Sequence, residues 1–118
     1  MENKNAIKLV DKILVNLDET GINTDVLIED IKQLRAFALE EQIPLVVKVL
    51  RLTYEHIEDN GAFLIPIPND EDSEFDEEEV EEIVGVESLK YLLALTKNLN
   101  NKMNISDLKE YRDLLNNN

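Results

Sequence analysis

The chain has 118 residues, with 12 basic and 26 acidic side chains, a net charge of −14 and no cysteine. This length suits one domain that folds without disulfides, and the hydrophobic content of 43% is that of a globular protein. The missing cysteines exclude disulfides and thiolate-based metal sites. The negative charge argues against nucleic acid or an anionic membrane surface as a partner.

Residues 4–18 carry an apolar row that predicts an amphipathic helix: Ala6, Val10, Ile13 and Leu17. Asn3 or Asn5 is expected to cap its first N–H groups, and Gly21 suits the position just past its end. This region has no signal-peptide core, and no run in the chain approaches the roughly 20 apolar residues of a membrane span. We therefore expect a cytoplasmic protein.

Two further helices are predicted over residues 25–41, with Thr24 as the N-cap, and 43–59, with Pro44 at the first helical position. The third helix is the most apolar stretch of the chain, so we expect the other elements to pack around it. Its polar residues share one narrow stripe: Lys48, Arg51, Glu55 and Glu58. Short connections between the three helices predict antiparallel neighbours.

Residues 61–78 form the predicted connection between the third and fourth helices. Ile65 and Ile67 each precede a proline, which favours extended backbone. We favour a strap across the bundle that buries Phe63, Leu64 and Ile65, since exposed apolar patches are uncommon on monomers. The alternative is an exposed docking strip.

The acidity of the chain is local, because residues 70–82 contain ten carboxylates and no basic residue. Outside this window 16 acidic residues face 12 basic ones, a net charge of −4. Six carboxylates match the ligand spacing of an EF-hand loop: Asp70, Asp72, Glu74, Asp76, Glu78 and Glu81. Phe75 stands where that loop needs glycine, so we expect a solvated acidic face; weak divalent binding of another kind stays open.

Helical periodicity resumes in residues 76–84 and 86–100, and Gly85 either breaks the helix or lies inside a longer one. A last helix is predicted from Asn104, with Asp107 in a capping-box-like position and Met103 packing on Leu108. Together these elements predict an all-α, single-domain antiparallel bundle of five to six helices spanning residues 1–118.

No motif in the chain indicates catalysis or a cofactor, since nucleophile, phosphate-binding and dinucleotide signatures are absent. His56 is the only histidine. We expect it to be a partly exposed structural residue; the alternative is a pH-sensitive group whose pKa Glu55 and Asp59 raise. We predict neither an enzyme nor a bound metal or cofactor.

The leading hypothesis is a non-catalytic module that binds a basic partner protein, by electrostatic steering and apolar contact. The predicted binding residues lie in the strap and the acidic run: Phe63, Leu64, Ile65, Asp70, Glu71, Asp72, Glu74, Asp76, Glu77 and Glu78. One alternative is an antagonist, such as an immunity protein, antitoxin or nucleic-acid mimic, that blocks a basic surface. Another is a structural protein that forms a homodimer through the strap or residues 89–99.

Overall fold

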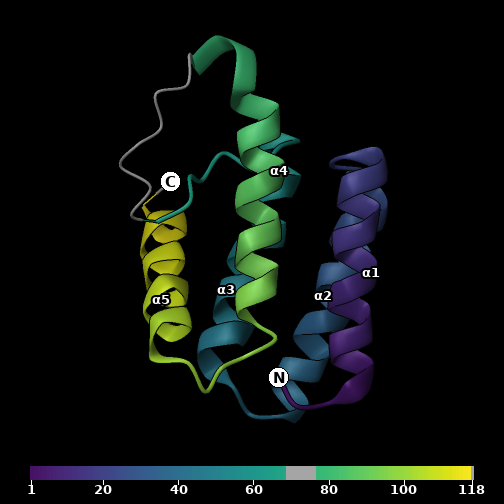
Figure 1. Cartoon of the computed structure of the whole chain (residues 1–118), viewed down its shortest axis with the longest axis vertical. Coiled ribbons are helices and arrows are strands. Elements are labelled where there is room, and N and C mark those ends of the chain that lie inside the picture. Colours follow the sequence, from purple (N-terminus) through teal and green to yellow (C-terminus); the bar gives the residue numbers. More distant parts are fainter. Residues whose placement is uncertain (69–76, 118) are drawn as a thin grey trace.

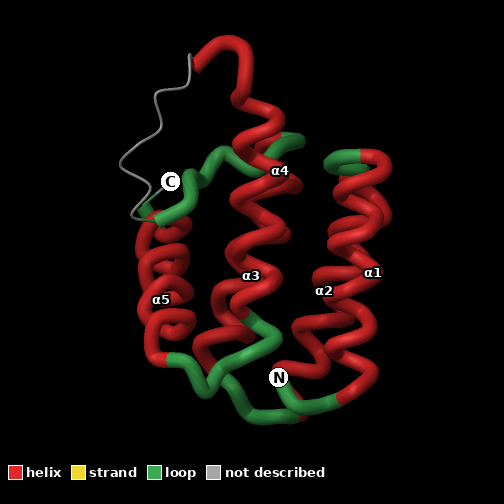
Figure 2. The backbone as a smooth tube through the Cα atoms, in the orientation of Figure 1, coloured by secondary structure: helices red, strands yellow, loops and turns green. Residues whose placement is uncertain are grey.

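The computed structural model describes residues 1–68 and 77–117, with side chains from Gly85 onward in the second range. The described residues form five α-helices and no strand (Figures 1 and 2). Their bounds are α1 (Lys4–Thr20), α2 (Thr24–Glu40), α3 (Pro44–Asn60), α4 (Glu77–Leu95) and α5 (Lys102–Asn116). The predicted all-α bundle is confirmed. Within the described ranges, no helix has the length and apolar character needed to cross a bilayer.

The helices run alternately up and down and close into a ring of neighbours (Figure 1). α1 packs against α2 and α4, α3 packs against α2 and α5, and α4 and α5 pack against each other. Each helix turns an apolar stripe inward, as its periodicity predicts. The largest fully buried apolar side chains come from α1 to α5 and the strap: Ile13, Ile31, Leu34, Leu50, Ile57, Phe63, Ile65, Leu89, Leu92, Leu93, Leu108 and Tyr111.

The expectation that the other elements surround α3 is met on one side only. Its buried face is formed by Val46, Val49, Leu50, Thr53, His56 and Ile57. Leu45, Val47, Leu52 and Tyr54 are only partly buried. The outer side of α3 is therefore free to line a surface feature.

Local signals set the ends of the first three helices. The Asn3 side chain accepts hydrogen bonds from the N–H groups of Asn5 and Ala6, at 2.8 and 3.3 Å. Gly21 and Gly61 follow α1 and α3 with φ of 67° and 66°, a region that favours glycine. The N-cap of α2 is Asn23 rather than the predicted Thr24, and its side chain makes no capping bond.

α4 continues through Gly85 as one helix, which resolves the alternative that the sequence left open. It ends at Leu95, earlier than the predicted residue 100. The Thr96 hydroxyl donates to the Leu93 carbonyl at 2.6 Å, and the N–H groups of Thr96 and Lys97 bond three residues back. This tightened turn satisfies the last carbonyls and closes the helix.

The start of α5 corrects the prediction of a helix from Asn104. Asn101 is the N-cap, and its side chain accepts from the N–H groups of Met103 and Asn104 at 2.8 and 3.4 Å. Met103 is therefore inside the helix and 74% exposed, so it does not pack on Leu108.

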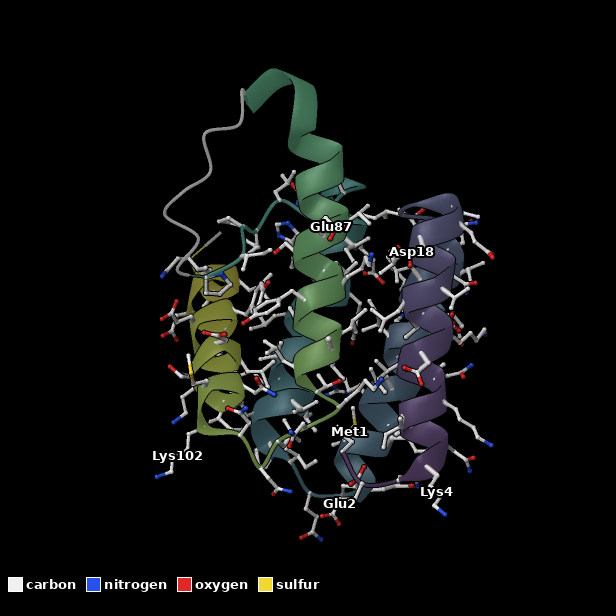
Figure 3. All side chains as sticks on the ribbon, viewed as in Figure 1. Met1, Glu2, Lys4, Asp18, Glu87 and Lys102 are labelled. Atoms are coloured by element: carbon white, nitrogen blue, oxygen red, sulfur yellow. The ribbon has the colours of Figure 1, made fainter. Side chains whose placement is uncertain are left out.

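Charged side chains join α1 to α4 and to the turn after it. Lys90 lies 2.5 Å from Asp18 and 3.5 Å from Glu87, and Lys97 lies 2.6 Å from Asp11. Figure 3 shows Asp18 and Glu87 at the same level of the two helices. At the other end of the bundle, the Met1 amino group donates to the Thr96 carbonyl at 2.6 Å.

Candidate functional site

The strap, residues 61–68, leaves the end of α3 and crosses the bundle (Figure 2). Phe63 and Ile65 are 1% and 2% exposed, whereas Leu64 between them is 43% exposed. The predicted strap is thus confirmed for Phe63 and Ile65 and wrong for Leu64. Alternate residues of an extended chain point to opposite sides, so a strap cannot bury three in a row against one surface. Of the three predicted apolar contacts, only Leu64 is available at the surface.

Phe63 fixes the strap between three helices. Its ring lies 5.6 Å from His56 of α3, edge to face, and 6.4 Å from Tyr111 of α5. Its carbonyl oxygen lies against Gly85 of α4, where a Cβ atom would overlap it. Gly85 therefore lets the strap backbone approach α4 closely.

His56 ties the strap to α3 by a hydrogen bond that sequence reasoning missed. Its Nε2 accepts the Leu64 N–H at 3.0 Å, so the neutral ring carries its proton on Nδ1. His56 is 7% exposed, which corrects the expectation of a partly exposed residue. Burial lowers the pKa of His56 and outweighs the opposing effect of Asp59, so the alternative of a raised pKa is wrong.

The acidic part of the predicted site falls largely outside the described residues. Asp70, Glu71, Asp72, Glu74 and Asp76 all lie in the range 69–76, as do the first four candidate EF-hand positions. Glu77 and Glu78 open α4, and their backbone is described. In the chain, the strap precedes the range 69–76 and α4 follows it.

A second surface lies between the C-terminal half of α2 and the N-terminal half of α3. We call it the α2–α3 groove: an open hollow of about 430 Å³ lined by Arg35, Leu39, Gln42, Ile43, Pro44, Val47, Lys48 and Arg51. The lining combines apolar side chains, among them Leu39, Ile43 and Val47, with three cations, Arg35, Lys48 and Arg51. Gln42, in the turn between the helices, has φ of 57°, which is uncommon for a residue other than glycine.

No pattern along one helix predicts this groove, because its cations come from two helices. The signal was nonetheless present on each helix separately. Residues 44, 47, 48 and 51 share one stripe of α3, and residues 35, 39 and 42 share one stripe of α2 and its turn. Only the packing of α2 on α3 joins the two stripes into one surface.

The side chains that the structure describes include two tyrosines with raised pKa values. No group of three or more histidine, aspartate or glutamate residues among the described side chains could hold a metal ion. The Tyr91 hydroxyl donates to Asp107, and this hydrogen bond raises the pKa of Tyr91 to about 12, which stabilises its protonated form. Burial raises the pKa of Tyr111, whose hydroxyl bonds to Ser88. Both tyrosines join α4 to α5.

Comparison with known proteins yields no match to a family model, to a curated protein or to a solved structure.

Proposed function

We propose that this protein is a non-catalytic interaction module that binds a basic partner protein through residues 70–82, the acidic segment, with Leu64 as an apolar contact beside it. The observation that carries the proposal is the exposure of Leu64 between two buried neighbours on the strap that leads into this segment. An exposed leucine held by a packed strap offers an apolar contact, and nearby carboxylates would steer a cationic surface toward it.

The charges of the bundle support this placement of the site. Lysines of α1, α2 and α4 pair with carboxylates of the bundle itself, as in Lys12 with Asp30, Lys32 with Glu58 and Lys90 with Asp18. Residues 70–82 contribute −10 of the net charge of −14 and contain no cation, so most of the unbalanced negative charge lies there. A partner with clustered lysine or arginine residues complements that excess.

The test compares two variants that lose the same charge at different places. One neutralises four of the ten carboxylates of the segment (Glu71→Gln, Asp72→Asn, Glu74→Gln, Asp76→Asn). The control neutralises exposed carboxylates of α1 and α2 (Glu19→Gln, Asp25→Asn, Glu29→Gln, Glu40→Gln). Each immobilised protein is used to capture proteins from a lysate of the source cell, at NaCl concentrations from about 50 to about 500 mM.

We expect the wild type and the control to capture a basic protein that the segment variant does not capture. Capture should weaken with salt, and Leu64→Ala should reduce it while leaving the fold intact. Equal capture by the segment variant, or capture unaffected by salt, would contradict the proposal. If DNA or RNA competes with the protein for the captured partner, the partner is held by its nucleic-acid-binding surface, as the antagonist hypothesis requires.

A further inference from the structure

The α2–α3 groove concentrates positive charge on a protein whose net charge is −14. Lys48 has no hydrogen-bond or ion-pair partner among the described residues. Arg51 lies 3.9 Å from Glu55, both side chains are about half exposed, and such pairs are weak. Arg35 uses its Nε–H to bond the Val47 carbonyl at 3.3 Å, which holds its guanidinium at the edge of the groove.

The groove also offers apolar contact, since Leu39 is 52% exposed and Ile43 and Val47 are only partly buried. Its open shape favours an extended peptide over a small molecule. Small-molecule sites enclose most of the ligand surface, whereas this hollow of about 430 Å³ is open to solvent. It suits a peptide segment that lies along it, with apolar side chains on the floor and carboxylates toward the three cations.

The chain itself contains a segment of this chemistry. Residues 70–82 combine ten carboxylates with two apolar side chains, Phe75 and Val80. We propose that the α2–α3 groove binds the acidic segment of a second copy of this chain. The inference rests on the proposed role of the acidic segment in recognition, and it makes the α2–α3 groove of another copy one partner of that segment.

The chain's own acidic segment cannot cover the groove. The groove lies in the half of the bundle where α2 passes to α3, while the strap begins and α4 starts at the other end (Figure 1). Lys48 lies 12 residues before Asn60, the last residue of α3, so about 18 Å separate it from that end, at about 1.5 Å per residue, and Arg35 bonds to Val47 at the same level. Eight residues, 69–76, join the strap to α4. A loop of that length held at both ends reaches out only about 14 Å, at about 3.5 Å per residue.

Each contact joins the acidic segment of one copy to the groove of another. Two copies that exchange both segments form a closed dimer, whereas copies that give the segment to one neighbour and the groove to another form an open chain. Either assembly should weaken as salt screens the ionic contacts.

Three variants test the proposal by sedimentation velocity, from micromolar to millimolar protein at about 50 mM NaCl. Lys48→Glu/Arg51→Glu reverses the exposed charges of the groove and leaves Arg35 in place. The segment variant of the previous section removes four of the ten carboxylates of the acidic segment. The control, Lys4→Glu/Lys8→Glu, makes the same charge change on the exposed face of α1, where Figure 3 shows Lys4 extending into solvent.

We expect the wild type and the control to form dimers or larger species as the concentration rises, and the groove and segment variants each to stay monomeric over the same range. An equimolar mixture of these two variants should form a 1:1 complex and stop there. One protein supplies the intact segment and the other the intact groove, so only one contact can form.

Self-association of the groove variant like that of the wild type, or a mixture that stays monomeric, would overturn the proposal. So would a wild type that stays monomeric at millimolar concentration, even if it binds a synthetic peptide of residues 69–84; the groove would then serve another acidic protein. Capture of a basic protein by a monomeric wild type would leave the proposed function standing. A segment variant that associates like the wild type would also overturn this proposal, and the proposed function would still be decided by the capture experiment.

Discussion

Gly85 is required by the strap and not by its own helix. Glycine inside a helix costs about 1 kcal/mol relative to alanine, so Gly85→Ala would stabilise an isolated α4. In the folded chain the new methyl group would overlap the Phe63 carbonyl oxygen. We expect Gly85→Ala to lower the free energy of unfolding by about 1–3 kcal/mol, measured by urea denaturation.

Ala94 offers the matched control on the same helix, because it is exposed and has no such neighbour. Ala94→Gly should cost about 1 kcal/mol, so alanine is the better residue at position 94 and glycine at position 85. A stabilising effect of Gly85→Ala would show that the strap does not press on α4.

His56 makes the stability of the strap depend on pH. Burial lowers the pKa of His56 in the folded chain, so below about pH 6.5 the unfolded chain takes up a proton that the folded chain resists. Protonation of Nε2 would also remove the acceptor for the Leu64 N–H. We expect the free energy of unfolding to fall between about pH 6.5 and 5.5, by at most about 1.4 kcal/mol per pH unit.

His56→Gln isolates this effect, because glutamine keeps a neutral acceptor and does not titrate. The variant should be less stable than the wild type near neutral pH, and its free energy of unfolding should change less over the same pH range. Urea titrations at several pH values measure both. Parallel pH profiles for the two proteins would mean that the folded chain accommodates the charged ring.

At the scale of elements, a buried tyrosine hydroxyl helps to join α5 to α4. The Tyr111 hydroxyl donates to the Ser88 carbonyl at 2.9 Å, and the hydroxyl oxygens of Tyr111 and Ser88 are also 2.9 Å apart. Tyr111→Phe would remove both of these buried hydrogen bonds, so we expect a loss of about 1–2 kcal/mol in the free energy of unfolding.

Tyr54 provides the comparison for Tyr111. It is partly buried, and its ring lies 5.2 Å from the Lys32 ammonium, a contact that phenylalanine can keep. Tyr54→Phe should change the free energy of unfolding by less than about 0.5 kcal/mol. Equal effects of the two substitutions would indicate that the Ser88 contact contributes nothing beyond burial of the ring.

At the scale of the whole molecule, a net charge of −14 opposes compaction, and salt screens this repulsion. We expect the melting temperature of dilute protein to rise by about 2–4 °C as NaCl increases from about 10 to about 150 mM. The segment variant should melt higher at low salt and respond less, because four of the charges are gone. A melting temperature that falls with salt would instead mean that the ion pairs of the bundle dominate.

Local signals in the sequence account for most of the fold. Pro44, Gly21 and Gly61 mark helix ends through backbone geometry that any neighbour must accept. The apolar rows predict which faces of the helices are buried, and the prolines after Ile65 and Ile67 predict an extended strap. Each of these signals depends on residues a few positions apart.

Only the tertiary structure decided which residues of that frame reach the surface. Leu64 is exposed and His56 is buried because of the way the strap lies on α3. The Phe63 carbonyl oxygen occupies the space that a side chain at position 85 would need, so glycine is required there. The cations of the α2–α3 groove form one surface because two helices pack side by side. These outcomes depend on contacts between segments far apart in the chain, and the spacing of residues along one helix carries no information about its neighbours.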